Sequence, residues 1–537
     1  MISTMMDSQL TLEPMLRRAA TLFREREIVC RMPDRSTQRC TYAHLDERAH
    51  KLARALAAAG LKKGERVATL MWNHRAHLEA YFGIPLAGGV THTLNLRLPP
   101  AQLGFIARHA EDRFLIVDSV LLPILDTFVA EAGFERIFVH QICDGKHSFE
   151  DYDALLEHAP KDAKLPQLSE YDGAAMCYTS GTTGDPKGVL YSHRALALHS
   201  LSLTSADNVA LSQNDTVLAL APMFHANSWG MPFVATMVGA KQVLPGPRVD
   251  PESVLDLCEE EEVTFAYGVP TVWMGVCDYL DQCGRRLPRP IRILVAGSAP
   301  SEALIRRLDQ HGIHAIQAWG LTETSPLATM ARTPDCVAEA EHDRYSLVCS
   351  QGKTIPFIEA RVINDKGEVP ADGCTMGEVQ LRGPWVASSY FKMPALGDKW
   401  TDDGWFRTGD VVTIDRHGYL RIVDRTKDLI KSGGEWISSV DMENALLAHP
   451  GIREAAAIAV PHPKWGERPL AILVAKEGCK PEASELNAVL AEKFAKWQLP
   501  EYVFVGELPH TSTGKLLKSA LRQQHCERYS ESSVAAK

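Results

Sequence analysis

Residues 178–188 read Tyr-Thr-Ser-Gly-Thr-Thr-Gly-Asp-Pro-Lys-Gly, and this stretch decides how the rest of the chain is interpreted. Small hydroxyl residues and glycines allow a loop to curl its backbone N–H groups around anionic oxygens, and Lys187 adds a positive charge. A Walker A loop is excluded, because it requires Gly-Lys-Ser/Thr and Lys187 lies between a proline and a glycine. A flexible linker is the alternative, but a linker does not need a lysine within a Pro-Lys-Gly turn. The stretch therefore predicts a phosphate-binding loop that follows an apolar strand.

The segments around this loop alternate between helix and strand patterns. Apolar residues recur with helical spacing from Leu45 to Leu56, with Thr41 as the N-cap and Gly60 just beyond the end. A second amphipathic helix is expected over 251–261. Short apolar runs typical of buried parallel strands are found at 66–71, 114–117, 217–220, 263–267 and 293–296. The alternation predicts an α/β architecture in which helices cover parallel sheets.

The pattern changes after about residue 345. Glycine and Asp-Gly pairs become frequent between β-rich runs at 378–382 and 419–423, which predicts hairpins and a small barrel. From Asp424 onward, helices are expected over 439–448 and 484–496, and strands over 454–460 and 470–474. These last elements predict a separate small α+β domain.

Length and composition limit the classes of protein to consider. A chain of 537 residues corresponds to about three to four domain-sized units, and its net charge of -10 argues against a nucleic-acid partner. The twelve cysteines include no Cys-x-x-Cys pair, which is typical of reduced thiols. The N-terminal residues have no signal-peptide pattern, and no apolar run reaches the roughly 18–20 residues of a membrane span. We therefore expect a cytoplasmic protein without a transmembrane segment.

Further motifs follow along the chain, and each is weak when it is considered alone. They are Phe-His-Ala-Asn-Ser-Trp at 224–229, Gly-Ser-Ala-Pro at 297–300, Trp-Gly-Leu-Thr-Glu-Thr at 319–324, Trp-Phe-Arg-Thr-Gly-Asp at 405–410, Asp-Arg-Thr-Lys-Asp-Leu-Ile-Lys-Ser-Gly-Gly-Glu-Trp at 424–436, and Pro-His-Thr-Ser-Thr-Gly-Lys at 509–515. Alone, His225 is more often a structural histidine, Glu323 an exposed loop glutamate and Lys515 a solvated lysine.

The order and approximate spacing of these motifs resemble the adenylate-forming superfamily of acyl-CoA synthetases, luciferases and peptide-synthetase adenylation domains. The resemblance covers nearly the whole chain. It implies a large N-terminal domain over residues 1–423, built from two αβαβα-type sheets and a small β-barrel. A hinge over 424–429 and a small mobile α+β domain over 430–537 complete the expected α/β fold.

The resemblance also implies which residues contact ATP, Mg²⁺ and coenzyme A. The implied contacts to these ligands are Thr179, Ser180, Gly181, Thr182, Thr183, Gly184, His225, Ala226, Trp229, Gly297, Ser298, Gln317, Ala318, Trp319, Gly320, Thr322, Asp410, Arg425, Lys427, Lys431 and Trp436. Glu323, with Thr179, is expected to hold Mg²⁺, which is usually bound by one or two carboxylates plus phosphates. The implied catalytic residues are Lys187, Thr322, Glu323 and Lys515.

The implied reaction is an ATP-dependent acid–CoA ligation through an acyl-adenylate. Lys515 is expected to act in adenylation, and rotation about Lys427 to bring in the loop 431–436 for thioester formation. The segments 431–439 and 463–465 look most like bacterial medium- to long-chain fatty-acyl-CoA ligases, and a homodimer is expected.

Several alternatives to a fatty-acid–CoA ligase stay open. The substrate of a CoA ligase with these motifs can also be a short methylthio, branched or aryl acid. The acceptor can be a carrier-protein thiol instead of coenzyme A. A luciferase-type monooxygenase and a nucleotide-binding protein that has lost catalysis rank lower, the last because Lys187, Glu323, Asp410, Arg425 and Lys515 are all in place.

Overall fold

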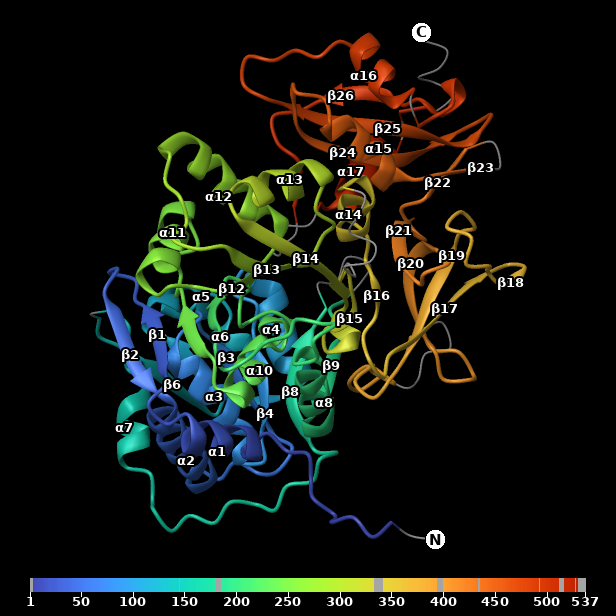
Figure 1. Ribbon diagram of the computed structural model, residues 1–537. Helices are drawn as coiled ribbons and strands as arrows, with labels where there is room; N and C mark the ends of the chain where they lie inside the picture. Colours follow the sequence, from blue (N-terminus) through green and yellow to red (C-terminus); the bar gives the residue numbers. More distant parts are fainter. Residues whose placement is uncertain are drawn as a thin grey trace.

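Figure 1 shows the computed structural model of the protein. The structure describes residues 3–143, 145–179, 185–332, 341–393, 399–432, 435–491, 493–510, 516–526 and 528–529.

The largest sheet has nine strands, and its central strands are parallel. In spatial order the strands are β16 (Lys353–Thr354), β15 (Leu327–Met330), β14 (Ile313–Gly320), β13 (Ile291–Val295), β12 (Phe265–Gly268), β10 (Thr216–Ala219), β11 (Lys241–Leu244), β1 (Glu27–Arg31) and β2 (Thr37–Thr41). The pairs from β14 to β1 are parallel, whereas β1–β2, β14–β15 and β15–β16 are antiparallel. A parallel strand covered on both faces is buried at every position, as β12 is, which explains the short continuous apolar runs.

A second sheet has seven strands and carries the phosphate-loop sequence at its edge. In spatial order the strands are β7 (Glu150–Asp151), β6 (Arg136–His140), β5 (Asp112–Asp118), β3 (Arg66–Leu70), β4 (Val90–Thr93), β8 (Gly173–Tyr178) and β9 (Gly188–Ser192). Only the last pair, β8–β9, is antiparallel, so the predicted loop connects the two strands at this edge.

Helices pack against both of these sheets. They are α1 (Glu13–Leu22), α2 (Tyr42–Ala58), α3 (Arg75–Leu86), α4 (Pro100–Ala110), α5 (Leu122–Leu125), α6 (Val129–Ala132), α7 (Tyr152–Glu157), α8 (His193–Leu203), α9 (Ala226–Trp229), α10 (Met231–Val238), α11 (Pro251–Glu260), α12 (Pro270–Cys283), α13 (Glu302–Gln310) and α14 (Glu341–Val348). One buried core joins Leu45 of α2 to Val67 of β3 and Phe265 of β12, so helices and both sheets share this core. Two further apolar clusters pack against the nine-stranded and the seven-stranded sheet, respectively.

A third sheet is antiparallel and follows the nine-stranded sheet in the chain. Its strands, in spatial order, are β18 (Gly367–Glu368), β17 (Glu359–Asn364), β19 (Gly377–Arg382), β20 (Phe406–Ile414) and β21 (Leu420–Arg425). Within the described residues these strands pair as an open path, because β18 and β21 each have one neighbour. The expected small barrel is therefore an open antiparallel sheet in this structure.

The C-terminal part of the chain has its own sheet and apolar cores. The strands are β23 (Glu435–Ile437), β22 (Ile430–Ser432), β25 (Gly466–Ala475) and β24 (Ile452–His462), with β26 (Glu501–Phe504) paired to β25, and the helices are α15 (Ser439–Leu447), α16 (Ala483–Leu490) and α17 (Lys518–His525). This part lies at the end of the molecule opposite the N-terminus (Figure 1), and α15 contacts β21.

Most local expectations are confirmed, with one exception among the helices. The Thr41 hydroxyl accepts from His44 N, and Gly60 has a φ of +88° just beyond the end of α2. The helix expected over 484–496 instead ends at Leu490. Phe494 packs against the apolar core of the C-terminal part, and this tertiary contact outweighs the helix propensity of the residues after Leu490.

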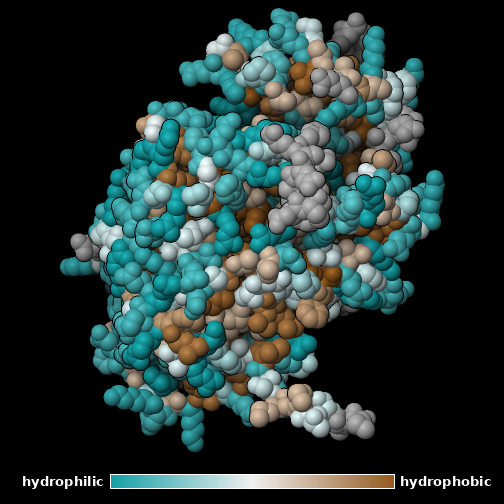
Figure 2. All heavy atoms as spheres, in the orientation of Figure 1, coloured by the Kyte–Doolittle hydropathy of each residue, from teal (hydrophilic) through white to brown (hydrophobic). Residues whose placement is uncertain are grey.

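The surface is mostly hydrophilic on the face that Figure 2 shows, but apolar side chains gather over β9 and α8. Leu190 of β9 and Leu201 of α8 are 43% and 49% exposed. Among the described helices, none combines the length and the apolar character that crossing a membrane requires.

Candidate active site

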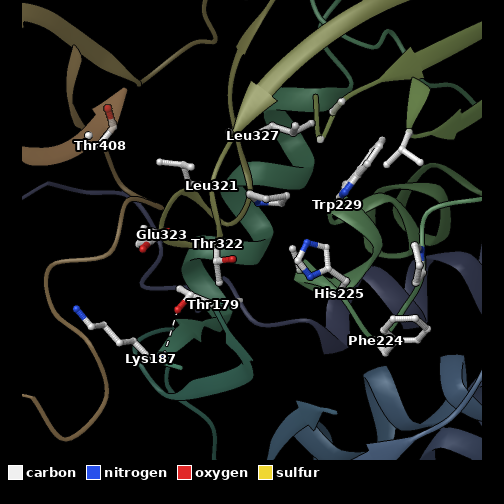
Figure 3. A pocket seen from close by; sticks show the side chains of 18 of the residues that line it. Thr179, Lys187, Phe224, His225, Trp229, Leu321, Thr322, Glu323, Leu327 and Thr408 are labelled. Carbon is white, nitrogen blue, oxygen red and sulfur yellow. Dashed lines mark hydrogen bonds between the residues drawn. The ribbon is translucent and has the colours of Figure 1, made fainter. Parts of the chain in front are cut away.

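A cavity of about 420 Å³ lies where the carboxyl ends of several parallel strands meet the β8–β9 loop and the start of the C-terminal part. Ligands of open α/β sheets bind at this kind of edge. The lining residues include Thr179, Lys187, Phe224, His225, Ala226, Trp229, Gly297, Gly320, Thr322, Glu323, Tyr390, Lys399, Thr408, Arg425 and Lys427. Figure 3 shows Lys187, Glu323 and Thr322 on one side of the cavity and Phe224, His225 and Trp229 on the other.

The two ends of the predicted phosphate loop are tied together. Thr179 N donates to the Lys187 carbonyl at 2.9 Å, and Lys187 N donates to the Thr179 hydroxyl oxygen at 3.2 Å (Figure 3). Residues 180–184, which the sequence analysis placed around the phosphates, lie outside the described residues. The anchors nevertheless bring Lys187 and the Thr179 hydroxyl to the same cavity wall.

Glu323 stands in a short helical turn, Thr322–Thr324, that follows β14. The residue is 9% exposed, and the Tyr390 hydroxyl donates to its Oε1 at 2.5 Å. Burial and the neighbouring Glu323 carboxylate raise the pKa of Tyr390, so the phenol keeps its proton and acts as the donor. The carboxylate and the Thr179 hydroxyl offer hard oxygen donors in one cavity, and these fit a Mg²⁺ ion that also contacts phosphate.

The turn that carries Thr322 and Glu323 is held by neighbouring segments. The Tyr191 hydroxyl donates to the Thr322 carbonyl at 2.7 Å, and Ala387 N donates to the Glu323 carbonyl at 2.7 Å. Gly320 has no room for a side chain, because an added Cβ would lie 1.8 Å from the Pro326 carbonyl oxygen. A glycine is therefore required where β14 leads into the turn.

The opposite side of the cavity is apolar and includes a left-handed turn. Ala226, Asn227, Ser228 and Trp229 all have positive φ, between 44° and 59°. This conformation is unfavourable for L-residues, and surrounding contacts must maintain it. The Ser228 hydroxyl donates to the Ala221 carbonyl at 2.7 Å and lies 2.8 Å from the Tyr267 hydroxyl. The turn places the Trp229 ring beside that of Tyr267, with their centres 5.9 Å apart.

The carboxylate of Asp410, which the resemblance implies as a ligand contact, has protein partners on both of its oxygens. Trp319 Nε1 donates to Oδ2 at 3.1 Å, and Arg425 Nε lies 3.2 Å from Oδ1. Asp410 is 3% exposed and, like Trp319, is not among the residues that line the cavity. Arg425 does line the cavity and connects this carboxylate to it.

Other expected residues lie away from the cavity or outside the described residues. Ser298 is exposed on the loop after β13 and Ala318 is buried in β14, and neither lines the cavity. Gln317 is buried, and its amide nitrogen, in the orientation that satisfies its hydrogen bonds, donates to the carbonyls of residues 348–350. Lys431 is exposed in β22, where its backbone N–H donates to Glu467 at 2.7 Å. Lys515 and the side chain of Trp436 lie outside the described residues.

Some lining residues were not identified from the sequence. Tyr390 has no recognisable motif around it, and only its contact with Glu323 identifies it. Arg97 lies over the Phe224 ring at 5.9 Å, and burial lowers the pKa of its guanidinium. Lys399 and Thr408 complete the wall near the start of the C-terminal part. A lone lysine or arginine in a loop is usually solvated, so the sequence offered no signal for Arg97 and Lys399, whereas Thr408 lies within the motif at 405–410.

The hinge expected over 424–429 is held by a backbone N–H group of α15 and a charged side chain of α17. Asp424 accepts from Ser439 N at 2.7 Å, and Asp428 forms an ion pair with Arg522. Lys427 lies between these two carboxylates in the chain and lines the cavity, where burial lowers the pKa of its ammonium.

Comparison with known proteins finds similar sequences and structures over nearly the whole chain. Residues 16–391 match the model of the AMP-binding enzyme family, and residues 441–515 match that of the AMP-binding enzyme C-terminal domain. A long-chain-fatty-acid–CoA ligase of Thermus thermophilus is 48% identical, with 98% of each chain covered. A 3-methylmercaptopropionyl-CoA ligase of Ruegeria pomeroyi is 41% identical over 98% of this chain and 99% of the relative. The crystal structure of the anthranilate CoA ligase AuaEII in complex with anthranoyl-AMP superposes with a TM-score of 0.84 at 25% identity, covering 98% and 99% of the two chains.

Proposed function

The chain belongs to the AMP-binding enzyme family, and we propose that it is an ATP-dependent acid–CoA ligase. The overall reaction converts a carboxylic acid, ATP and coenzyme A into an acyl-CoA, AMP and pyrophosphate. One observation carries the proposal: a single cavity joins a polar side, with Lys187, Thr322 and Glu323, to an apolar side next to Trp229. Such a cavity suits a carboxylic acid and a nucleoside triphosphate, with their reacting groups where the polar and apolar sides meet.

In the first half-reaction the substrate carboxylate attacks the α-phosphorus of ATP, and pyrophosphate leaves in line. Negative charge develops on the phosphoryl oxygens, so positioning and electrostatic stabilisation supply most of the catalysis. Lys187 and Thr322 stabilise this charge from the cavity wall. Mg²⁺, held by Glu323 and Thr179, supplies further charge neutralisation when bound. Lys515 is assigned to the same step from the resemblance of residues 509–515.

In the second half-reaction the coenzyme A thiolate attacks the acyl carbon of the adenylate, and AMP leaves. The proposed domains are 1–423 and 430–537, joined by the hinge 424–429, with Lys427 as the pivot. Rotation about this hinge withdraws Lys515 and introduces the loop 431–436. Lys427 lines the cavity, so a change in its backbone conformation alters the cavity wall directly.

The proposed acid is a medium- or long-chain fatty acid. The apolar side of the cavity includes Leu220, Val269 and Val272 beside Trp229, and these side chains offer an acyl chain no polar partner. The similarity to the Thermus long-chain-fatty-acid–CoA ligase supports this class, and the Ruegeria relative supports a short methylthio acid as the alternative. A pocket methylene is worth only about 1–3 kcal/mol, so a few lining residues decide between them.

The remaining proposals concern assembly and location. The protein is proposed to be a cytoplasmic homodimer formed through its N-terminal part. The exposed apolar Leu190 and Leu201 support a contact on that part, since exposed apolar patches often mark interfaces. Sedimentation of the wild type and of Leu201→Glu tests this: a monomeric wild type contradicts the proposal.

Release of AMP and pyrophosphate tests the proposed reaction. The purified protein is incubated with ATP, Mg²⁺ and propionate, 3-methylthiopropionate, octanoate, palmitate or benzoate, with and without coenzyme A. We expect turnover that depends on coenzyme A and is fastest with octanoate or palmitate. Glu323→Gln is the matched control and should lose both products. Pyrophosphate exchange without coenzyme A turnover points to a carrier-protein acceptor, and inactivity with every acid contradicts the proposal.

A further inference from the structure

Residues 385–391, here called the strap, cross over the turn that carries Glu323. Trp385 Nε1 donates to the Leu327 carbonyl at 3.1 Å, and Phe391 N donates to the Gly188 carbonyl at 2.8 Å. Ala387 N donates to the Glu323 carbonyl at 2.7 Å. The strap therefore holds the backbone of the Glu323 turn and the end of the phosphate loop at the same time.

Tyr390 is the strap side chain that reaches the functional groups themselves. Its hydroxyl donates to Glu323 Oε1 at 2.5 Å, and the Lys187 ammonium lies 5.1 Å from the centre of its ring. The Trp400 ring packs edge-on against the Tyr390 ring at 5.2 Å, and Trp400 Nε1 donates to the Ala387 carbonyl at 2.7 Å. Tyr390 is 4% exposed, so packing on several sides determines its orientation.

We propose that Tyr390 is a positioning residue of the adenylation half-reaction, whose hydroxyl orients the Glu323 carboxylate for Mg²⁺ and whose ring orients the Lys187 ammonium for phosphate. The inference rests on the proposed function. The terminal torsion of a glutamate is broad, so an isolated carboxylate samples many orientations. A fixed donor on Oε1 leaves Oε2 to turn toward the metal, and loss of such an outer contact typically lowers metal affinity about 10- to 100-fold.

The ring acts separately from the hydroxyl. An ammonium over an aromatic face is attracted by the ring quadrupole, and this attraction needs no hydroxyl group. Tyr390→Phe therefore removes the contact to Glu323 and retains the one to Lys187, whereas Tyr390→Leu removes both. Comparison of the two variants separates the effect of the hydroxyl on Glu323 and Mg²⁺ from the effect of the ring on Lys187 and phosphate.

The experiment measures binding, so that it does not depend on turnover. The affinity for α,β-methylene-ATP is measured by calorimetry with saturating Mg²⁺ and again with EDTA, and the ratio of the two dissociation constants gives the metal enhancement. For Tyr390→Phe we expect the enhancement to fall about 10-fold, with the EDTA value unchanged. For Tyr390→Leu the EDTA value should weaken as well. Tyr502→Phe is the matched control, because its hydroxyl also donates to a side-chain oxygen, that of Asn487, and lies outside the cavity.

A double-mutant cycle excludes a merely structural effect. In a Glu323→Gln background, Tyr390→Phe should leave the metal enhancement unchanged, because the carboxylate that the hydroxyl orients has been removed. Equal losses in both backgrounds, or wild-type enhancement in Tyr390→Phe, would overturn the inference alone. A wild type that binds no nucleotide would instead overturn the proposed function, and the inference with it.

Discussion

Replacement of Lys518 by methionine removes a buried positive charge, and we expect it to destabilise the C-terminal part strongly. Lys518 Nζ lies 2.7 Å from Glu443 Oε1 and 2.5 Å from the Ser439 hydroxyl, to which it donates. The side chains of Lys518 and Glu443 are 9% and 11% exposed. Asp424, 1% exposed, faces the same cluster and accepts from Ser439 N. Methionine retains most of the length of the side chain but leaves two carboxyl groups without their cation.

The magnitude follows from the cost of leaving a buried charge uncompensated. Breaking a buried ion pair by removing one partner costs about 3–5 kcal/mol in the free energy of unfolding. Every 1.4 kcal/mol corresponds to a factor of ten in an equilibrium constant, so the open population of the C-terminal part should rise by about two to four powers of ten. Hydrogen exchange of the amides in β24 and β25, followed by mass spectrometry, reports this population directly.

The effect of Lys518→Met should also depend on pH. Burial raises the pKa of Glu443 and of Asp424, and Lys518 opposes both shifts. Without Lys518 the pKa values of Glu443 and Asp424 rise further, so the folded variant binds more protons than the unfolded chain as pH falls. The loss of unfolding free energy relative to the wild type should therefore be smaller at pH 5 than at pH 8. Lys480→Met, at an exposed position, is the control. Exchange in Lys518→Met within about threefold of the wild type at pH 8 would contradict this prediction, since breaking a buried pair costs far more.

The remaining predictions concern the two half-reactions and the acid. Lys515→Ala should slow adenylation by about 10²–10³-fold, yet leave thioester formation from preformed acyl-adenylate unchanged, and single-turnover assays of both steps decide this. Trp229→Ala should raise kcat/KM for acids with longer chains by about 10-fold or more relative to octanoate, measured across a chain-length series. Asp410→Asn retains an acceptor for Trp319 but loses the charge opposite Arg425, and should raise the KM for ATP by about 10-fold at unchanged thermal stability of the N-terminal part.

The sequence predicted the elements that depend on local signals. Helix α2 begins after Thr41 and its apolar face is buried, because capping and helical spacing act within a few residues. The parallel strands were predicted from apolar runs for the same reason. The motif order placed Lys187, Thr322 and Glu323 together, and the cavity brings these residues to one wall.

The features that the sequence did not predict arise from contacts between distant segments. Tyr390 is 67 residues from Glu323 in the chain, and no periodicity links the two. The left-handed turn at 226–229 contains no glycine, and Asn227 is its one residue of a type that often adopts positive φ, so its composition does not indicate four such residues in succession. The hydrogen bonds of the Ser228 hydroxyl with Ala221 and Tyr267 maintain this conformation, and the folded sheet is what brings these two residues close to Ser228.

Asp410 shows why a motif predicts the chemistry of a residue better than it predicts which residues contact it. A carboxylate that is 3% exposed must be compensated by donors or cations, or its charged form is costly to bury. Trp319 and Arg425 supply that compensation in the protein itself, through one neutral and one charged contact. Each oxygen of an ionised carboxylate can accept about two hydrogen bonds, so a ribose hydroxyl that reached Asp410 would share this carboxylate with Trp319 and Arg425. Because Arg425 lies two residues before Lys427, its contact joins Asp410 to the segment of the proposed hinge.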